Sequence, residues 1–122
     1  MLIAARIAVG IVALLHVQFL VLEMFLWQTP TGLKVFRQSA ENAAITAVLA
    51  KNQGLYNGFL AAGLAWGILL SVQGAAHARD VICFFLGCVI VAGLYGAATA
   101  ARNILFIQAV PAIVALALVL AA

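Results

Sequence analysis

The sequence predicts an all-α membrane protein, a bundle of four transmembrane helices of which the fourth is kinked. Of its 122 residues, 68% are apolar and only 7% are charged, which is far outside the composition of soluble globular domains. The apolar residues form four runs, and a helix crosses the roughly 30 Å hydrocarbon core of a bilayer with about 20 such residues. A single domain with four membrane crossings therefore accounts for the whole chain, residues 1–122.

The first helix is expected over residues 2–27. Its apolar run is interrupted only by Arg6 near the start and by a few polar residues further along, and it is too long for the apolar core of a signal peptide. Trp27 is followed by a turn rich in Thr, Pro and Gly, and tryptophan is typical of the membrane interface. We therefore expect this helix to end at the membrane surface.

A longer, more polar connection is expected to follow, amphipathic over residues 33–51. It carries Lys34, Arg37, Glu41 and Lys51, and a short helix opened by Ser39 fits the residue pattern. Two arrangements stay open at this point. The segment either lies on the membrane as an amphipathic helix or extends the second helix into the aqueous phase.

The second helix is expected over residues 53–72 and contains two glycine pairs. Gly54 and Gly58 are four residues apart, as are Gly63 and Gly67. Glycines at this spacing allow two helix backbones to approach closely. We therefore expect tight packing of this helix against its neighbours.

The third helix is expected over residues 81–101, with Asp80 as its N-cap. A two-residue turn then leads to the fourth helix, expected over residues 104–122. Pro111 lies inside this last helix. Because proline has no backbone N–H, it removes one helical hydrogen bond and is expected to kink the helix.

Polar side chains gather in the half of the bundle that lies nearer the long connection. His16 and Glu23 are seven residues apart and so share a face of the first helix. A charged group at the centre of a membrane helix costs about 2.5–3.5 kcal/mol, so such residues usually face the bundle interior and have partners. The pattern predicts a ligand-binding site formed by His16, Glu23, Asn52, Gln53, Tyr56, Asn57, Tyr95 and Gln108.

Simpler roles for these residues are also open. Glu23 could reach the membrane surface or pair with Arg102, and His16 could be a buried histidine with a satisfied hydrogen bond. Asn57 and Gln108 could connect helices through hydrogen bonds alone. These alternatives weaken when all four helices supply polar groups to the same half of the bundle.

No metal, cofactor or nucleic acid is expected as a partner. His16, Glu23, Cys83 and Cys88 do not have the compact spacing of a zinc site. The two cysteines are five residues apart in one helix, so they point in different directions and cannot bridge each other. The net charge of +3, from six basic and three acidic residues, is too small for a nucleic-acid-binding surface. Glycine-rich nucleotide loops and Gly-x-Ser-x-Gly nucleophile motifs are absent from the sequence.

Four segments together resemble a known family. They are HVQFLVLEMFLW (16–27), NQGLYNGFLAAGL (52–64), FFLGCVIVAGLYGA (84–97) and FIQAVPA (106–112). The chain resembles, over nearly its whole length, the four-helix membrane family known as domain of unknown function 1304. The resemblance implies a four-helix membrane protein without an assigned activity. The four segments that carry the resemblance contain all the residues of the predicted ligand-binding site.

Three functions are compatible with these features. The first is binding or transport of a small hydrophobic or amphiphilic molecule in a one-sided polar pocket within the membrane, with Glu23 and His16 as polar anchors. The second is an intramembrane enzyme of the isomerase or cyclase type acting on a lipid-like substrate, with either residue as general acid or base. The third is a structural assembly subunit. Membrane lipid is an expected partner in each case, and a homodimer is compatible with all three.

The basic residues also predict an orientation, because cytoplasmic loops of membrane proteins carry an excess of Lys and Arg. Four basic residues lie on the side of the long connection and two on the other side. The first set is Lys34, Arg37, Lys51 and Arg102, and the second is Arg6 and Arg79. We therefore expect a plasma (inner) membrane protein with the connection 28–52 in the cytoplasm and both termini outside.

Overall fold

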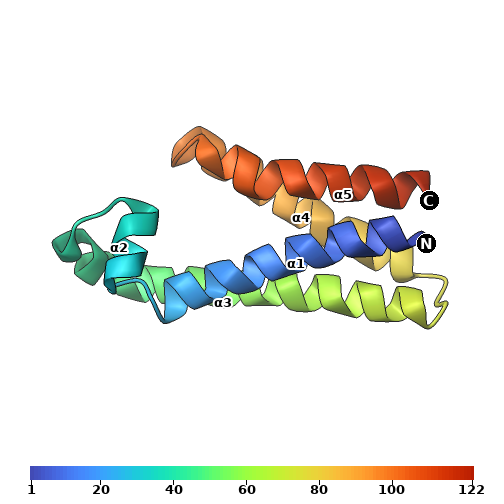
Figure 1. Ribbon diagram of the computed structural model, residues 1–122, viewed down its shortest axis with the longest axis horizontal. Coiled ribbons are helices and arrows are strands. Elements are labelled where there is room, and N and C mark those ends of the chain that lie inside the picture. Colours follow the sequence, from blue (N-terminus) through green and yellow to red (C-terminus); the bar gives the residue numbers. More distant parts are fainter. The chain divides into compact units, whose positions relative to one another are not determined.

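The structure is entirely helical, as the composition predicts (Figure 1). It is a computed structural model that describes all residues from 1 to 122. In chain order it contains α1 (Ile3–Met24), α2 (Pro30–Phe36), α3 (Ala40–Val72), α4 (Ala78–Thr99), the π-helix η1 (Leu105–Ala109) and α5 (Val110–Ala121). Helices α1, α3 and α4 are long and apolar enough to cross a membrane, whereas Leu105–Ala121 forms a shorter apolar helix.

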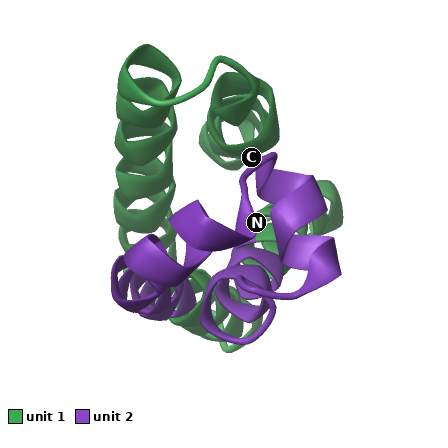
Figure 2. Cartoon of the chain, turned by 90° about the vertical axis from the view of Figure 1, so that its left-hand side faces the viewer, with its two compact units in different colours: residues 1–15, 60–122 green, residues 16–59 purple.

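The chain divides into two compact units (Figure 2). Unit 1 consists of residues 1–15 and 60–122, and unit 2 consists of residues 16–59. Both α1 and α3 therefore contribute to each unit. The N-terminus and the C-terminus lie at the same end of unit 1 (Figure 1).

Unit 1 has a core to which four helices contribute. The first half of α1, the second half of α3, α4 and α5 all supply side chains to it. Many of these side chains are small, which suits a membrane protein, because helices in lipid associate through close packing rather than through the hydrophobic effect. The core residues are Ala5, Val9, Val12, Ala13, Leu64, Ile82, Leu86, Val89, Ala112, Ala115 and Val119.

Gly63 and Gly67 bring α3 against α4 in this unit. A Cβ atom at Gly63 would collide with the ring of Phe85, and one at Gly67 would collide with Cγ1 of Ile82. Larger residues at these positions would force the two helices apart. The close packing predicted from this glycine pair is confirmed.

Helix α3 begins at Ala40 rather than at residue 53. Most of the expected amphipathic connection, residues 33–51, is therefore helical and forms the first three turns of α3. The Ser39 hydroxyl accepts a hydrogen bond from the Asn42 N–H at 3.1 Å, which starts the helix as expected. No glycine or proline follows before Gly54 to end it. At 33 residues, α3 is about 50 Å long, more than the roughly 30 Å that a hydrocarbon core requires.

A tight turn connects α1 to α2. Helix α1 ends at Met24, three residues before the expected end at Trp27. The Thr29 hydroxyl donates a hydrogen bond to the Leu26 carbonyl at 2.7 Å and accepts one from the Gly32 N–H at 3.3 Å. A Cβ atom at Gly32 would collide with the Leu26 carbonyl oxygen, so this turn requires glycine.

Helix α4 begins at Ala78, with His77 as its N-cap residue. The prediction of Asp80 as the N-cap is therefore wrong, because the connection from α3 is shorter than expected. Gly74, with a φ angle of 74°, turns the chain two residues after the end of α3 at Val72, and glycine adopts this left-handed conformation without steric cost. Asp80 lies in the first turn of α4, where a negative charge interacts favourably with the helix dipole.

The expected fourth helix, residues 104–122, contains an irregularity just before Pro111. The Val110 N–H donates to the Leu105 carbonyl, five residues earlier, so the helix widens into the π-helical turn η1. Pro111 cannot donate to the carbonyl four residues before it, and it stands in the first turn of α5. Gly93 of α4 allows η1 to approach, since a Cβ atom there would lie 2.8 Å from the Ala109 N atom.

Candidate functional site

Glu23 and Asn57 form a buried polar pair in unit 2. Only 5% of the Glu23 surface and 8% of the Asn57 surface are exposed. The Asn57 Nδ2 group donates a hydrogen bond to Glu23 Oε1 at 3.2 Å. The second carboxyl oxygen, Glu23 Oε2, is also buried and has no hydrogen-bond partner. Half of this carboxyl group is therefore bound by the protein and half is not.

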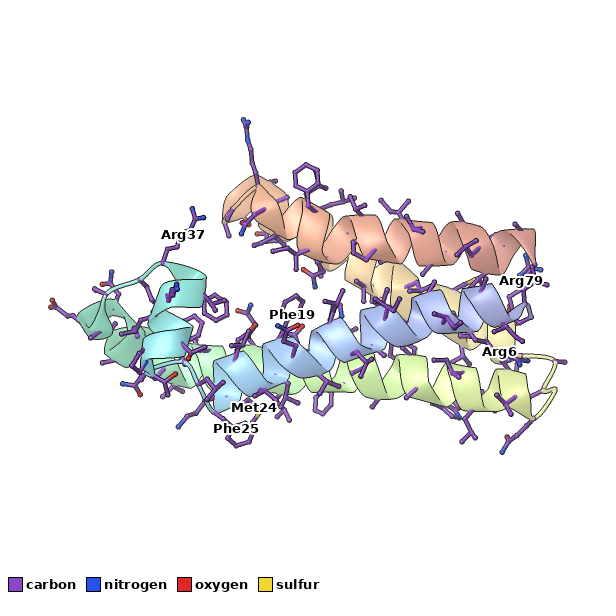
Figure 3. The ribbon with its side chains drawn as sticks, in the orientation of Figure 1. Arg6, Phe19, Met24, Phe25, Arg37 and Arg79 are labelled. Atoms are coloured by element: carbon purple, nitrogen blue, oxygen red, sulfur yellow. The ribbon has the colours of Figure 1, made fainter.

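Glycines of α3 allow α1 to lie close enough for this contact. A Cβ atom at Gly54 would lie 2.7 Å from Met24 Cγ and 3.1 Å from Glu23 Cβ, and one at Gly58 would lie 2.6 Å from Leu20 Cδ1. The close packing predicted from this second glycine pair is confirmed. Leu20 and Met24, the second of which is labelled in Figure 3, therefore pack directly against the glycines of α3.

His16 lies on the same face of α1 as Glu23, two turns earlier. The imidazole is fully buried, with 0% exposed surface, and it packs edge-on against the Phe19 ring with a centroid distance of 5.4 Å. Seven residues of helix correspond to about 10 Å along the axis, so His16 does not contact the Glu23 carboxyl group directly. The two residues form a buried polar line along α1, with apolar side chains between them.

The other polar residues expected from the second helix do not join this pair. Asn52, Gln53 and Tyr56 are all exposed. The Asn52 side chain donates to the Val48 carbonyl of its own helix at 2.9 Å, and Tyr56 is 60% exposed. The helical period explains why Asn57 is buried and these three residues are exposed. Asn57 lies next to the face of α3 on which Gly54 and Gly58 meet α1, and the other three positions are rotated further away from that face.

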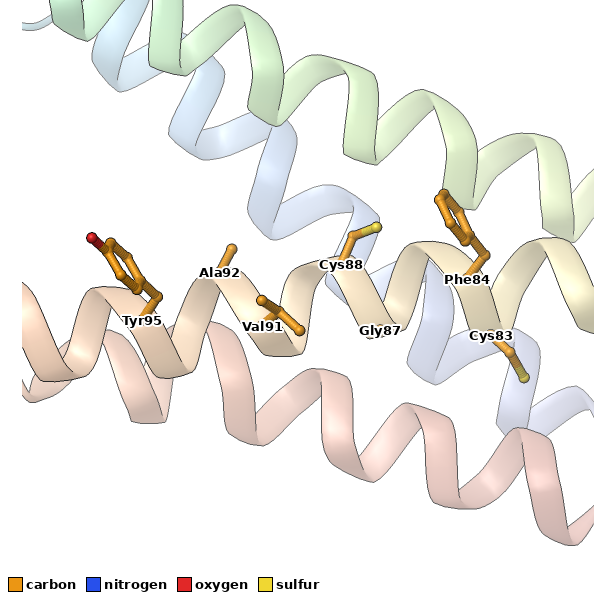
Figure 4. Close-up of a pocket in the computed structure, with 7 residues that line it drawn as sticks. All are labelled: Cys83, Phe84, Gly87, Cys88, Val91, Ala92 and Tyr95. Carbon is orange, nitrogen blue, oxygen red and sulfur yellow. The ribbon is translucent and has the colours of Figure 1, made fainter.

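Tyr95 and Gln108 belong to unit 1. Gln108 is half-buried in η1, whereas Tyr95 is 72% exposed. Tyr95 lines an open apolar groove along α4, shown in Figure 4, together with Cys83, Phe84, Gly87, Cys88, Val91 and Ala92. Both cysteines are free thiols, in agreement with their spacing.

Trp27 has a role that the sequence did not reveal. Its indole N–H donates to the Ala43 carbonyl at 3.1 Å and to the Thr46 hydroxyl at 3.3 Å. The ring also packs against Phe36 of α2, with a centroid distance of 4.6 Å. Trp27 thus connects the end of α1, α2 and the start of α3, beside the Glu23 site in sequence.

A second missed contact connects α1 and α3 in unit 1. The Arg6 guanidinium donates to the Ser71 hydroxyl at 2.9 Å and to the Ser71 carbonyl at 3.0 Å. Figure 3 labels Arg6 at the end of unit 1 where the termini lie. In the sequence, Ser71 is a polar residue in an apolar run. This position was the signal that could have indicated a hydrogen-bond partner for Ser71.

The Glu23 site, formed by Glu23 and Asn57, offers a hydrogen-bond acceptor. The structure contains no group of three or more His, Cys, Asp or Glu residues that could hold a metal ion. An ionised carboxyl group accepts hydrogen bonds on both oxygens and donates none. Oε2, which is buried and has no partner in the structure, therefore has the chemistry to accept one more hydrogen bond.

Comparison with known proteins places the chain in a family. The family model described as "Protein of unknown function (DUF1304)" matches residues 10–120. The "Uncharacterized protein YpaA" of Lactococcus lactis subsp. lactis (strain IL1403) is 32% identical over 108 residues, which cover 87% of each chain. No solved structure matches. The family match covers nearly the whole chain and agrees with the resemblance seen in the four sequence segments, so this protein belongs to the DUF1304 family of proteins of unknown function.

Proposed function

We propose that this protein is an integral membrane protein that binds a small hydrophobic or amphiphilic molecule at Glu23. The observation that carries the proposal is the unpartnered oxygen Oε2 of a side chain that is only 5% exposed. Most buried polar groups in proteins have a hydrogen-bond partner, and an exception asks for an explanation. A bound molecule whose polar end meets Oε2 is such an explanation.

The energetic argument favours a ligand over an empty site. A buried polar group without a hydrogen bond costs about 1–3 kcal/mol, and more if it is charged. Asn57 satisfies Oε1 only. If Glu23 served only to tie α1 to α3, a single hydrogen bond from the neutral Asn57 amide would have to offset the burial of the whole carboxyl group. A ligand that pairs with Oε2 supplies the missing interaction.

The surroundings support an amphiphilic ligand in particular. Leu20 and Met24, which precede and follow Glu23 in the sequence of α1, are apolar and lie against the two glycines of α3. These side chains offer contact to an apolar body, while Oε2 offers one position for a polar head. The same binding step would serve a protein that carries such a molecule within or across the membrane.

Native mass spectrometry of the purified protein tests this proposal. Protein released from its own membranes in mild detergent should carry a noncovalent small-molecule adduct that Glu23→Gln removes. Glu41→Gln is the matched control, because it makes the same change at an exposed carboxyl group in the first turn of α3. Equal adducts on the wild type and on Glu23→Gln would refute a ligand at this carboxyl group.

We also propose four membrane crossings, by α1, α3, α4 and the combined helix Leu105–Ala121, in the plasma membrane. An even number of crossings agrees with the two termini lying at one end of unit 1. The excess of basic residues supports a cytoplasmic connection 28–52 and outside termini. A C-terminal reporter that is active only outside the cytoplasm should be active, and a reporter inserted after Gln38 should not.

A further inference from the structure

The Glu23 site also indicates which head group the ligand carries, if the proposed function holds. The Glu23 carboxyl group has one hydrogen-bond partner, Asn57, which is neutral. Oε2 has none. Within unit 2 the basic side chains are Lys34, Arg37 and Lys51, and all three are exposed. The unit therefore contains a buried carboxyl group without a cation of its own.

His16 does not take this role. It is buried on the same face of α1, but two helical turns separate it from Glu23, about 10 Å along the axis. The Phe19 ring packs against its imidazole. None of the basic side chains of unit 2 therefore serves as the partner of Oε2.

We propose that the ligand is an amphiphile with a protonated amine head, which donates an N–H hydrogen bond to Glu23 Oε2. A buried ion is costly unless an opposite charge and hydrogen bonds compensate it. An ammonium group supplies both at once, because it carries a positive charge and donates through its N–H groups. An alcohol supplies the hydrogen bond without the charge. A carboxylate head would add a second negative charge and repel Glu23.

Asn57 acts as a positioning residue for this contact. Its Nδ2 group holds Oε1 at 3.2 Å, which fixes the rotation of the carboxyl group and so the position of Oε2. Gly54 maintains the helix distance, since a Cβ atom there would lie 3.1 Å from Glu23 Cβ. The acceptor is therefore oriented before a ligand arrives, which reduces the entropy cost of binding.

A head-group comparison on the wild-type protein tests this inference. The protein is placed in phosphatidylcholine nanodiscs and labelled with a photoreactive dodecylamine that carries a diazirine in its alkyl chain. Unlabelled dodecylamine, dodecanol and dodecanoate, which share one chain length, then compete for the site. We expect dodecylamine to compete at least about tenfold more strongly than either of the others, and labelling to map to peptides of α1 and α3.

Variants connect this preference to the carboxyl group. Glu23→Gln keeps the shape of the side chain but removes its charge, so dodecylamine should lose its advantage over dodecanol. Glu41→Gln should retain the advantage in full. The comparison on the wild type requires no variant, so a folding defect in Glu23→Gln would leave the main result standing.

The possible results separate this inference from the proposed function. If dodecanol competes as well as dodecylamine and labelling still maps to α1 and α3, the site exists and the amine head is wrong. If labelling is not competed by any of the three molecules, the binding site itself is refuted. If Glu41→Gln reduces the amine preference as much as Glu23→Gln, the charge that attracts the amine lies elsewhere, and the inference is wrong.

Discussion

Replacing Gly67 with alanine should separate α3 from α4 and destabilise the protein. The added Cβ atom would collide with Ile82 Cγ1 and lie 3.4 Å from the Ile82 backbone N. Ile82 is fully buried in the core of unit 1, and Cγ1 is attached to the branched Cβ atom, so it has little freedom to rotate away. Relief of the collision therefore requires movement of a helix.

The magnitude follows from two opposing terms. Overpacking of a dense core typically costs about 1–3 kcal/mol, while replacement of glycine by alanine in a helix stabilises by up to about 1 kcal/mol. Gly87→Ala isolates the second term, because a Cβ atom at Gly87 of α4 has no neighbour within 4 Å. We expect Gly67→Ala to be about 1–3 kcal/mol less stable than Gly87→Ala.

The assay is equilibrium unfolding in mixed micelles, with the fraction of denaturing detergent as the variable. A double-mutant cycle identifies the cause, because Ile82→Ala removes the colliding Cγ1 atom. In that background Gly67→Ala should cost less than it does in the wild type, and the difference is the coupling energy. Equal stability of Gly67→Ala and Gly87→Ala within about 0.5 kcal/mol would refute the close contact of α3 with α4.

Substitutions at two further places, Arg37 and the Arg6–Ser71 contact, are tested by thermal unfolding in detergent. Arg37 ends α2 in the left-handed conformation with a φ angle of 51°, which costs an L-residue about 1–2 kcal/mol. Arg37→Gly should therefore raise the free energy of unfolding, whereas Arg37→Ala should not. A loss of stability in Arg37→Gly would contradict this. Arg6→Lys replaces the two guanidinium nitrogens that donate to Ser71 with a single nitrogen on a flexible chain. It should destabilise by about 1–3 kcal/mol, more than Ser71→Ala, which removes only the hydroxyl. A lysine variant as stable as the wild type would show that the paired geometry is unimportant.

The features that sequence predicted well depend on local chemistry. Ser39 opens a helix through its hydroxyl group, and Gly63 and Gly67 meet a neighbouring helix because their missing side chains leave room for one. Such properties belong to the residues themselves.

The predictions that differed depend on tertiary context. Asp80 is a good N-cap residue, but α4 begins at Ala78, so Asp80 lies in its first helical turn. Asn52, Gln53 and Tyr56 are exposed because of the rotation of α3 about its axis relative to α1. The position of a residue along the helix does not specify this rotation. The contacts of Trp27 with α3 depend on the path of the turn between α1 and α2; the residue pattern predicts that turn but not the direction in which the chain leaves it.

The two glycine pairs of α3 also have a consequence for biosynthesis. Gly54 and Gly58 form a face that meets α1, whereas Gly63 and Gly67 form a face that meets α4, so the two pairs serve different neighbours. The neighbour of the first face, α1, has already been synthesised when α3 leaves the ribosome, whereas α4, the neighbour of the second, has not. Because chains fold as they emerge from the ribosome, α1 and α3 can pair at once, while the Gly63–Gly67 face has no partner in α4 until α4 has been synthesised.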